Sequence, residues 1–502
     1  MVYDLNDRTM MGIQTTQKEL FSYEVDLERR VRRDNPLRAI RERVDFAWVR
    51  AEVAHYYGHN GNESVDPEVI LKLLFLLFLD NVKSERELMR IVPERLDYLW
   101  FLGFGLDDEI PDHSVLSKAR ARWGRETFER FFVRTVAQCV KLGLVDGTKI
   151  HVDSSLVRAD AAYDSFTQSS PELASALRAA FAVEESKFEV DREVQLYKPK
   201  HRVSFSRTDP DATLASKHGG GVFTMAEPRY KSHRAVDDRC GVITAVEITP
   251  GHIFDGACAV ALAEQHHRVT GTGAETVVAD RHYGTRENIR ALQALGIRTH
   301  LQITRSKGLA ARKGIFHAND FKYDFATDTY RCPANQTLTR RGHDSLRQLT
   351  RFTADTNVCR SCPLRAQCTT AATGPKSIEH PDGYELLIKG WAQAKSAEAK
   401  RDLRRRMTLI EGSFGQATLS HHFKRARWRR LWRQRIQDHL IAAVQNVKKL
   451  IAHGPRATSS AAGCLPEPPK PASNGGLGLR DVFVWLENVF RRFLSELMPY
   501  FC

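Results

Sequence analysis

The sequence predicts an α/β fold in which a mixed sheet flanked by helices follows an N-terminal all-helical domain. The first observation behind this prediction is the order strand, hairpin, helix, strand, helix, strand over residues 148–303. The second is the apolar pattern of residues 15–140, where apolar side chains recur every three or four positions. The third is a group of four cysteines between residues 332 and 368, which interrupts the strand and helix order before a long helical stretch.

Composition limits the class of protein before any motif is considered. Of the 502 residues, 42% are hydrophobic and 27% are charged, which excludes a wholly disordered chain and allows a sizeable core. Lys and Arg number 75 against 61 Asp and Glu, so the formal charge is +14 and nucleic acid is the first candidate partner. Binding to a membrane surface and simple solubility are the alternative explanations of this charge.

No segment predicts secretion or insertion into a membrane. The N-terminal residues are polar, and the most apolar run, Ile70–Leu79, is far shorter than the ~20 residues of a membrane span. We therefore expect Ile70–Leu79 to be a buried core helix, and the protein to be cytoplasmic and associated with the nucleoid. The nine cysteines are then expected to be reduced thiols.

The N-terminal helical domain, residues 15–140, contains two start signals for helices. Ser84 is followed three residues later by Glu87, which is the spacing of a capping box. Asp112 or Ser114 can cap a helix within EIPDHSVLSKARARWG, residues 109–124. The exposed face of that helix is expected to carry Lys118, Arg120 and Arg122. Such a face suits contact with DNA phosphates, and a solvated charged face is the alternative.

Short local patterns define the elements of the predicted sheet, whose first part we place at residues 141–304. A turn at Asp146-Gly147 precedes a strand that ends at Asp153, and a polar excursion with one helix at about 171–189 follows. The later elements are two strands at 232–251 around a turn near 238–241, a helix at 257–269, a strand at 275–280, a helix at 285–296 and a strand at 297–303.

The rest of the chain divides into four segments. Residues 305–399 form an insertion with polar turns and the cysteines, and residues 400–453 form the C-terminal helical part of the core, within a helical stretch from about 395 to 452. Residues 454–480 form a flexible linker rich in Pro, Gly, Ser and Ala, and residues 481–502 form a short amphipathic helix. The last helix is expected to dock on a partner or on the chain itself, and a membrane surface is the alternative.

Three carboxylates are the candidate catalytic groups. Asp153 and Asp280 each end a predicted strand, and in open sheets of this type ligands gather beyond the strand ends. Two such carboxylates on neighbouring strands can share Mg²⁺, or Mn²⁺ in its place, to activate water against a phosphodiester. Glu411, on the long helical stretch, is the best third ligand. A turn or cap role is the alternative for each aspartate, and Asp237 competes with Asp280 for the second position.

The surroundings of Glu411 are strongly basic. Residues 401–435 contain eleven Lys and Arg against two acids, with Trp428 and Trp432 between them. A single acid in such a region makes sense if the basic side chains hold phosphates and the acid holds a metal. The predicted DNA-binding set here is Arg404, Arg405, Arg406, Lys424, Arg425 and Arg427. The alternative is a solvated arginine face over a core that contains the tryptophans.

The cysteine group consists of Cys332, Cys359, Cys362 and Cys368. The spacing Cys359-x-x-Cys362 is that of a zinc knuckle, and four thiolates can close a tetrahedral structural Zn²⁺ site. Four reduced thiols in a loop-rich insertion are the alternative. A catalytic thiol is not expected, because His380 is the only loose candidate for its partner.

Five segments, in this order, resemble motifs of the DDE transposases of bacterial insertion sequences: EIPDHSVLSKARARWG, HVDSSLVRADA, YKSHRAVDDRCGVITAVEITPGHIFD, VVADRHYGT and IEGSFGQ. The resemblance covers roughly residues 15–452 and is to the IS-eleven-eighty-two-like group within the IS4/IS5-related superfamily. It implies an RNase H-like core in which Asp153, Asp280 and Glu411 hold the catalytic metal. It also speaks against Asp237 as a member of this triad.

The resemblance further implies a transposase that binds terminal inverted repeats, cleaves strands and joins them to target DNA as a homodimer or larger assembly. Many relatives carry Tyr, Arg and Lys around the catalytic Glu, where this chain has Arg404, Met407 and Thr418. Either of the two arginines after Arg404, together with Lys424, can substitute. The main alternative function is a catalytically inactive, transposase-derived DNA-binding protein. Two others are a structural or regulatory chain and a nuclease that cleaves without joining.

Overall fold

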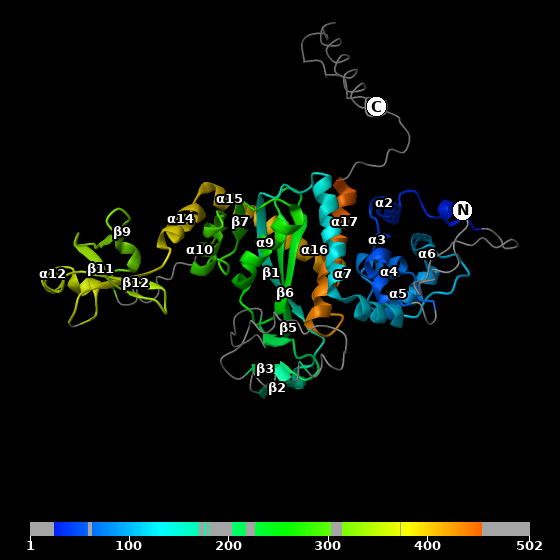
Figure 1. The fold of residues 1–502 in the computed structure, drawn as a ribbon, viewed down its shortest axis with the longest axis horizontal. Coiled ribbons are helices and arrows are strands. Elements are labelled where there is room, and N and C mark those ends of the chain that lie inside the picture. The colour runs from blue at the N-terminus through cyan, green and yellow to red at the C-terminus, as the bar shows by residue number, and fades with distance from the viewer. Residues whose placement is uncertain are drawn as a thin grey trace, which may run out of the picture. The chain divides into compact units, whose positions relative to one another are not determined.

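The computed structural model describes residues 25–58, 63–169, 175, 176, 179, 203–216, 226–302, 314–371 and 373–453 (Figure 1). The chain divides into two compact units, residues 1–454 and 455–502, and all described residues lie in the first. The expected linker and C-terminal helix at 454–502 therefore lie outside the described residues. So do residues 15–24 of the helical domain and most of the helix expected at 171–189.

The N-terminal region is helical, as the apolar spacing predicts. Its helices are α1 (Leu27–Arg30), α2 (Pro36–Arg43), α3 (Trp48–Val53), α4 (Pro67–Leu79), α5 (Glu85–Ile91), α6 (Leu96–Leu102) and α7 (Ser114–Lys141), with 3-10 turns at Ala54–Tyr56 and Val92–Glu94. The apolar run forms the buried helix α4. Ser84 caps α5, because its hydroxyl accepts the backbone N–H of Glu87 at 3.1 Å. α7 bends at Gly124, whose φ is 69°.

A six-stranded mixed sheet forms the centre of the described chain. Its strands are β1 (Lys149–Arg158), β4 (Thr213–Ala215), β5 (Glu227–Asp237), β6 (Ile243–Pro250), β7 (Thr276–Ala279) and β8 (Arg298–Leu301). β1 pairs antiparallel with β5 and parallel with β7, while β6 lies antiparallel to β5 and β8 parallel to β7. Helices α9 (Ala259–Thr270) and α10 (Arg286–Ala294) precede β7 and β8 in the predicted order. A separate two-stranded sheet joins β2 (Phe166–Ser169) to β3 (Val203–Ser206).

The strand expected to end at Asp153 is longer than predicted, and it ends at Arg158. Its parallel partner β7 stops at Ala279, which pairs with Val152. Its antiparallel partner β5 continues beside it until Arg229 lies opposite Arg158. The long partner keeps satisfying the backbone groups of β1 after the short one has ended, so the strand passes through Asp153.

The helical stretch expected from 395 to 452 is broken. It consists of α15 (Ala397–Arg406), a π-helical segment (Met407–Glu411), α16 (Gly412–Ser420) and α17 (Leu431–His453). Between Ser420 and Leu431 the chain pairs in parallel with the last residue of β1. The N–H of Arg158 donates to the carbonyl of Lys424, and the N–H of Ala426 donates to the carbonyl of Arg158. These backbone bonds replace those that a continuous helix would make.

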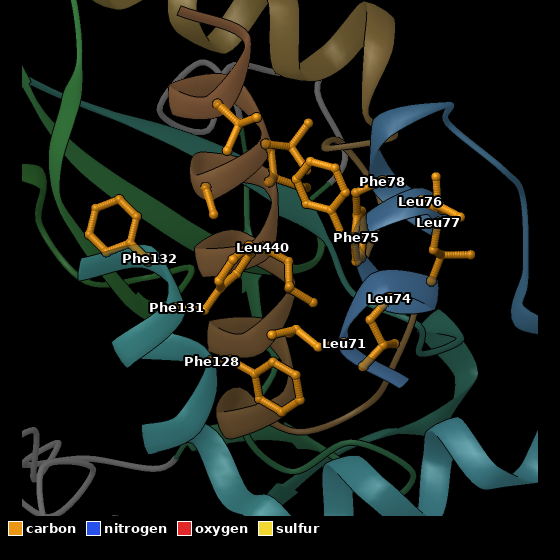
Figure 2. Close-up of a cluster of buried hydrophobic side chains, with 14 of the residues drawn as sticks. Leu71, Leu74, Phe75, Leu76, Leu77, Phe78, Phe128, Phe131, Phe132 and Leu440 are labelled. Atoms are coloured by element: carbon orange, nitrogen blue, oxygen red, sulfur yellow. The ribbon is translucent and has the colours of Figure 1, made fainter. Parts of the chain in front are cut away.

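One core joins the N-terminal helices to the sheet. α17 packs against α4, α7 and β6, and Figure 2 shows buried side chains from all three helices, among them Phe75, Phe78, Phe128, Phe131 and Leu440. Trp428 and Trp432 pack against this core, as expected. Burying each Leu or Phe side chain is worth roughly 1.5–3 kcal/mol, so α17 is held firmly beneath the strands.

Residues 314–381 contain a second sheet that the sequence analysis did not predict. Five antiparallel strands follow the order β13-β12-β11-β10-β9: β9 (Lys322–Asp324), β10 (Thr329–Arg331), β11 (Thr337–Asp344), β12 (Leu349–Thr353) and β13 (Ser377–Pro381). The short helices α12 (Thr356–Arg360) and α13 (Arg365–Cys368) lie between β12 and β13, and α14 (Tyr384–Ala394) returns the chain to α10 and β8.

Candidate active site

Asp153 and Asp280 lie next to each other at one edge of the paired region of β1 and β7. The parallel pairing runs as far as Val152 and Ala279, and the two aspartates are the next residues of the two strands. Asp280 begins a turn, where its Oδ1 accepts the backbone N–H of His282 at 2.9 Å. Burial raises the pKa of Asp153, and the nearby Asp280 charge adds to the rise while Arg406 opposes it. The two carboxylates are thus close enough to affect each other.

Glu411 comes from the segment between α15 and α16. It is the last residue of the π-helical segment, which contacts β1 and β5. Such segments within α-helices are often found at functional sites, because the extra residue redirects one side chain. The side chain of Glu411 is 50% exposed, whereas that of Asp153 is 18% exposed. Glu411 therefore forms the open side of the candidate site.

Arg406 connects two of the three carboxylates. Its Nη1 donates to Oδ2 of Asp153 at 2.8 Å, and its Nη2 lies 3.5 Å from Oε1 of Glu411. The guanidinium is largely buried. A positive charge thus lies between Asp153 and Glu411. This contact also supports the expectation that an arginine next to Arg404 substitutes for the family's missing Arg.

A fourth carboxylate, which the sequence analysis did not single out, borders the site. Asp255 follows β6, and Nδ1 of His282 lies 3.4 Å from both Asp255 Oδ2 and Asp280 Oδ2. Lys231 donates from Nζ to Asp255 Oδ1 at 2.5 Å. The signal was present in the sequence, because Asp255 ends the third motif quoted for the family resemblance.

Asp237, the alternative to Asp280, has a structural role at the other end of β1. It pairs with Ile150, three residues before Asp153. Its Oδ2 accepts the N–H of Gly147 at 2.8 Å and its Oδ1 accepts the N–H of Arg239 at 2.9 Å. Burial raises its pKa. Asp237 therefore satisfies turn backbone away from Asp153 and Asp280.

A second acidic cluster lies along α15, about one helical turn before Arg406. Within the described chain, the only set of three metal-ligating side chains with all ligand atoms within 4.8 Å is His300, Glu398 and Asp402. Asp402 Oδ2 lies 2.6 Å from Nδ1 of His300, and Asp402 Oδ1 accepts from Nζ of Lys149 at 3.0 Å. Lys149 also reaches Glu398 at 3.7 Å. The ammonium of Lys149 lies near both carboxylates and offsets part of their negative charge.

Arg120, expected on an exposed DNA-binding face, is 4% exposed and points inward. It forms an ion pair with Glu85, and its guanidinium lies 3.9 Å from the ring centroid of Trp428. Burial lowers its pKa to about 9. The spacing of residues within α7 could not reveal this orientation, because the two partners come from elsewhere in the chain. Glu85 lies on α5 and Trp428 lies in the segment before α17. Lys118 and Arg122 are exposed, as expected.

The basic side chains around Glu411 divide into inward and outward sets. Arg427 points inward, where it donates to the carbonyl of Lys83 at 2.8 Å and lies over the ring of Phe78. Burial lowers its pKa to about 10. The exposed set is Arg404, Arg405, Lys424 and Arg425. A contact with DNA stays a prediction for these four.

His380 is not paired with any of the four cysteines of the insertion. It is buried among aromatic rings, with Nδ1 3.2 Å from the hydroxyl of Tyr330 and its ring stacked on Tyr384. This environment is that of a core histidine.

Two protein-family models match the chain. A Transposase domain (DUF772) matches residues 25–122, from the start of the described helices into α7. A Transposase DDE domain matches residues 331–451, which include the four cysteines, Glu411 and most of α17. No curated protein matches the chain.

These matches support an insertion-sequence DDE transposase, in agreement with the family resemblance. The narrower IS-eleven-eighty-two-like group stays a prediction. A DDE transposase domain implies dependence on a divalent metal and action on DNA. Among the described helices, none is long and apolar enough to cross a membrane.

Proposed function

We propose that the protein is an active DDE transposase, which cleaves the ends of its insertion sequence and joins them to target DNA. The observation that carries this proposal is the placement of Asp153 and Asp280 as the next residues of two neighbouring parallel strands, with Glu411 connected to Asp153 through Arg406. The strands follow the order β6-β5-β1-β7-β8. The pairs β6–β5 and β5–β1 are antiparallel, and the pairs β1–β7 and β7–β8 are parallel, which supports an RNase H-like core.

The donor set suits Mg²⁺ or Mn²⁺. Asp153, Asp280 and Glu411 offer carboxylate oxygens, which are the ligands that hard divalent ions prefer. The guanidinium of Arg406 between two of them supports a place for positive charge there. When bound, the metal would activate water or a 3′-hydroxyl and stabilise the leaving oxygen of the phosphodiester.

The protein's own side chains prepare this chemistry. Arg406 favours the ionised form of Asp153 against the effect of burial, so it keeps the carboxylate ready to bind a cation. Glu411 stands half exposed at the rim and leaves room for a DNA strand to approach. His282, between Asp255 and Asp280, offers a ring nitrogen that can donate a hydrogen bond to a phosphate at this rim.

Exposed basic side chains flank the carboxylates, and they support binding of the DNA backbone. Lys424 donates from Nζ to Oγ of Ser155, two residues beyond Asp153 on β1, at 2.5 Å. The other members of this set are Arg404, Arg405 and Arg425. We assign terminal-repeat recognition to the N-terminal helices, with Lys118 and Arg122 as phosphate contacts. Two ends must be joined in one event, so we also propose a homodimer or larger assembly on DNA.

An inactive DNA-binding protein is the second candidate function, because two family positions carry other residues. Met407 is 58% exposed and offers no charge. The hydroxyl of Thr418 donates to the carbonyl of Phe414 in its own helix at 2.8 Å. Since Arg406 and Lys424 lie beside the carboxylate-bearing elements, we favour the active transposase.

The test is metal-dependent nicking and joining of DNA that carries the element's own ends. Glu411→Gln should keep DNA binding and lose cleavage by more than about 100-fold, because one metal ligand is removed. Glu398→Gln is the matched control, since it changes the same group one helix earlier, where Lys149 and not a metal is its neighbour. Cleavage by Glu411→Gln at the wild-type rate would contradict the assignment. Binding without cleavage by the wild type would establish the inactive protein.

A further inference from the structure

We propose that Cys332, Cys359, Cys362 and Cys368 bind one structural Zn²⁺, which holds together the small sheet β9–β13. This site is separate from the carboxylate site and has no part in the phosphodiester chemistry. All four thiols are free, and all four line a single cavity of about 30 Å³. Four cysteines that line one small cavity offer the donor set of structural zinc sites.

Cys332 lies at the tight turn that joins β10 to β11. Its carbonyl accepts the N–H of Asn335 at 2.8 Å, and Asn335 has a φ of 60°. The N–H of Gln336 then points back at the sulfur of Cys332, at 3.2 Å. A backbone N–H directed at a cysteine sulfur stabilises the thiolate form, which is the form that binds metal.

The other three cysteines lie on the two short helices that connect β12 to β13. Cys359 belongs to α12 and Cys368 ends α13, with Cys362 in the turn between them. That turn is closed by backbone bonds from Cys362 to Cys359 and from Arg365 to Cys362. A metal bound by all four thiols would therefore tie the β10–β11 turn to the α12–α13 segment, which are joined in sequence only through β11 and β12.

The sheet needs such a link, because its own core is small. The buried hydrophobic side chains of this cluster are Phe321, Tyr330, Leu338, Phe352, Ala354 and Ile378. Cys332, Cys359 and Cys368 pack against this cluster and extend it to the cavity. Six buried side chains form a small core for about 65 residues, and small domains often gain stability from a metal or a disulfide.

Two cations beside the thiols favour a negatively charged cluster. Lys376 and Arg365 both line the cavity. Arg365 also donates to the carbonyls of Cys359, Ala371 and Gly374, which fixes its guanidinium beside the cysteines. Four thiolates around Zn²⁺ carry a net charge of −2, which Lys376 and Arg365 can balance.

Metal binding is expected to draw the thiols together. Zn–S bonds of about 2.3 Å place tetrahedral sulfur atoms nearly 4 Å apart. In the described chain no three of these thiols have sulfur atoms that all lie within 4.8 Å of one another. The α12–α13 segment consists of two short exposed helices, so it can make this adjustment without disturbing the sheet.

The experiment measures zinc in the full-length protein, purified under reducing conditions without chelator from cells grown with added zinc. We expect about one Zn²⁺ per wild-type chain, and a drop of at least about tenfold in Cys332→Ser. Cys362→His keeps four ligands and is expected to retain the metal, which separates ligand loss from misfolding. Cys240→Ser alters a free thiol outside the group, and Glu411→Gln removes a carboxylate ligand; both should retain the zinc.

Co²⁺ substitution supplies the second readout, because thiolate ligands give an intense charge-transfer absorption that carboxylates do not. This band should appear in the wild type and in Cys240→Ser, and should be lost in Cys332→Ser. A wild-type chain with less than ~0.1 Zn²⁺ and with all four thiols reduced would overturn the proposal. A disulfide among the four cysteines in the freshly purified protein would also overturn it.

Discussion

Two acidic clusters lie one helical turn apart along the same face of α15, and their differences bear on which of them suits a catalytic metal. Asp402 and Arg406 are one helical turn apart on this helix, which packs against β7 and β8. Asp402 belongs to the cluster of His300, Glu398 and Lys149. Arg406 belongs to the cluster of Asp153, Asp280 and Glu411.

The first cluster is the tighter one, and yet we do not assign the chemistry to it. Asp402 is 6% exposed and His300 is 2% exposed, so DNA cannot reach them. Asp402 already forms an ion pair with Lys149. The second cluster is looser, but Glu411 is half exposed and the strand ends open towards solvent. Ligand distance alone is therefore a poor guide, because a catalytic site must also admit its substrate.

The largest expected effect is on the open cluster. Asp153→Asn should leave the protein folded and lower the rate of metal-dependent cleavage by more than about 1,000-fold, equivalent to about 4 kcal/mol. The reason is that Asp153 is a proposed metal ligand, is held on the long strand β1 and contacts Arg406. Cleavage would be measured at saturating Mg²⁺. A rate within tenfold of the wild type would show that the two clusters do not differ as we propose.

The closed cluster should respond in stability and not in chemistry. Asp402→Asn is expected to lower the free energy of unfolding by about 3 kcal/mol, because it leaves Lys149 without its best buried partner. Urea denaturation of the full-length protein measures this change. Cleavage per folded molecule should fall by less than about tenfold. A larger loss of cleavage at unchanged stability would instead assign a catalytic role to the His300 cluster.

Arg406 tests the connection between the acids of the open cluster. Arg406→Gln removes the charge that holds Asp153 and Glu411 towards each other, and we expect a roughly tenfold lower cleavage rate. Arg406→Lys keeps the charge with a different shape and should recover part of the rate. The comparison is made by steady-state cleavage of all three proteins. Equal rates in the wild type and the Gln variant would show that Arg406 positions nothing.

The smallest effect is expected at the neighbouring arginine. Arg405 pairs with Asp238 at 2.6 Å, but its side chain is 49% exposed, so Arg405→Gln should change stability by less than about 1 kcal/mol. If Arg405 contacts a phosphate, the slope of log affinity against log salt concentration falls by about 0.9 in magnitude. DNA binding at several KCl concentrations measures this slope. An unchanged slope would remove Arg405 from the DNA-binding set.

Local sequence signals predicted much of the fold. The Ser84 cap and the short strand before Asp280 both act within a few residues, and both are found as expected. The turn expected at Asp146-Gly147 lies earlier, at Leu142-Gly143, although Gly147 has a φ of 83°. The sheet β9–β13 was missed because most side chains of its longest strand, Thr337–Asp344, are exposed. An exposed polar strand has no apolar alternation to reveal it.

The break between α16 and α17 was missed for a different reason. The residues between Ser420 and Leu431 are compatible with a helix, but Lys424 and Ala426 find backbone partners on Arg158, which is far away in the sequence. The inward orientation of Arg120 likewise depends on Glu85 and Trp428. No local pattern can encode partners that only the folded chain brings near.

The sequence by itself determined the family, the identities of the three carboxylates and four cysteines, and the order of most strands and helices, because these depend on residue type and local spacing. Only the tertiary structure decided which acids are neighbours, which arginines face inward, and which cluster is open to DNA. Strand pairing placed Asp153 beside Asp280, and the packing of α15 placed Asp402 beside His300 and Arg406 beside Asp153. Burial and electrostatic partnership are properties of the packed chain, so they arise only when distant segments meet.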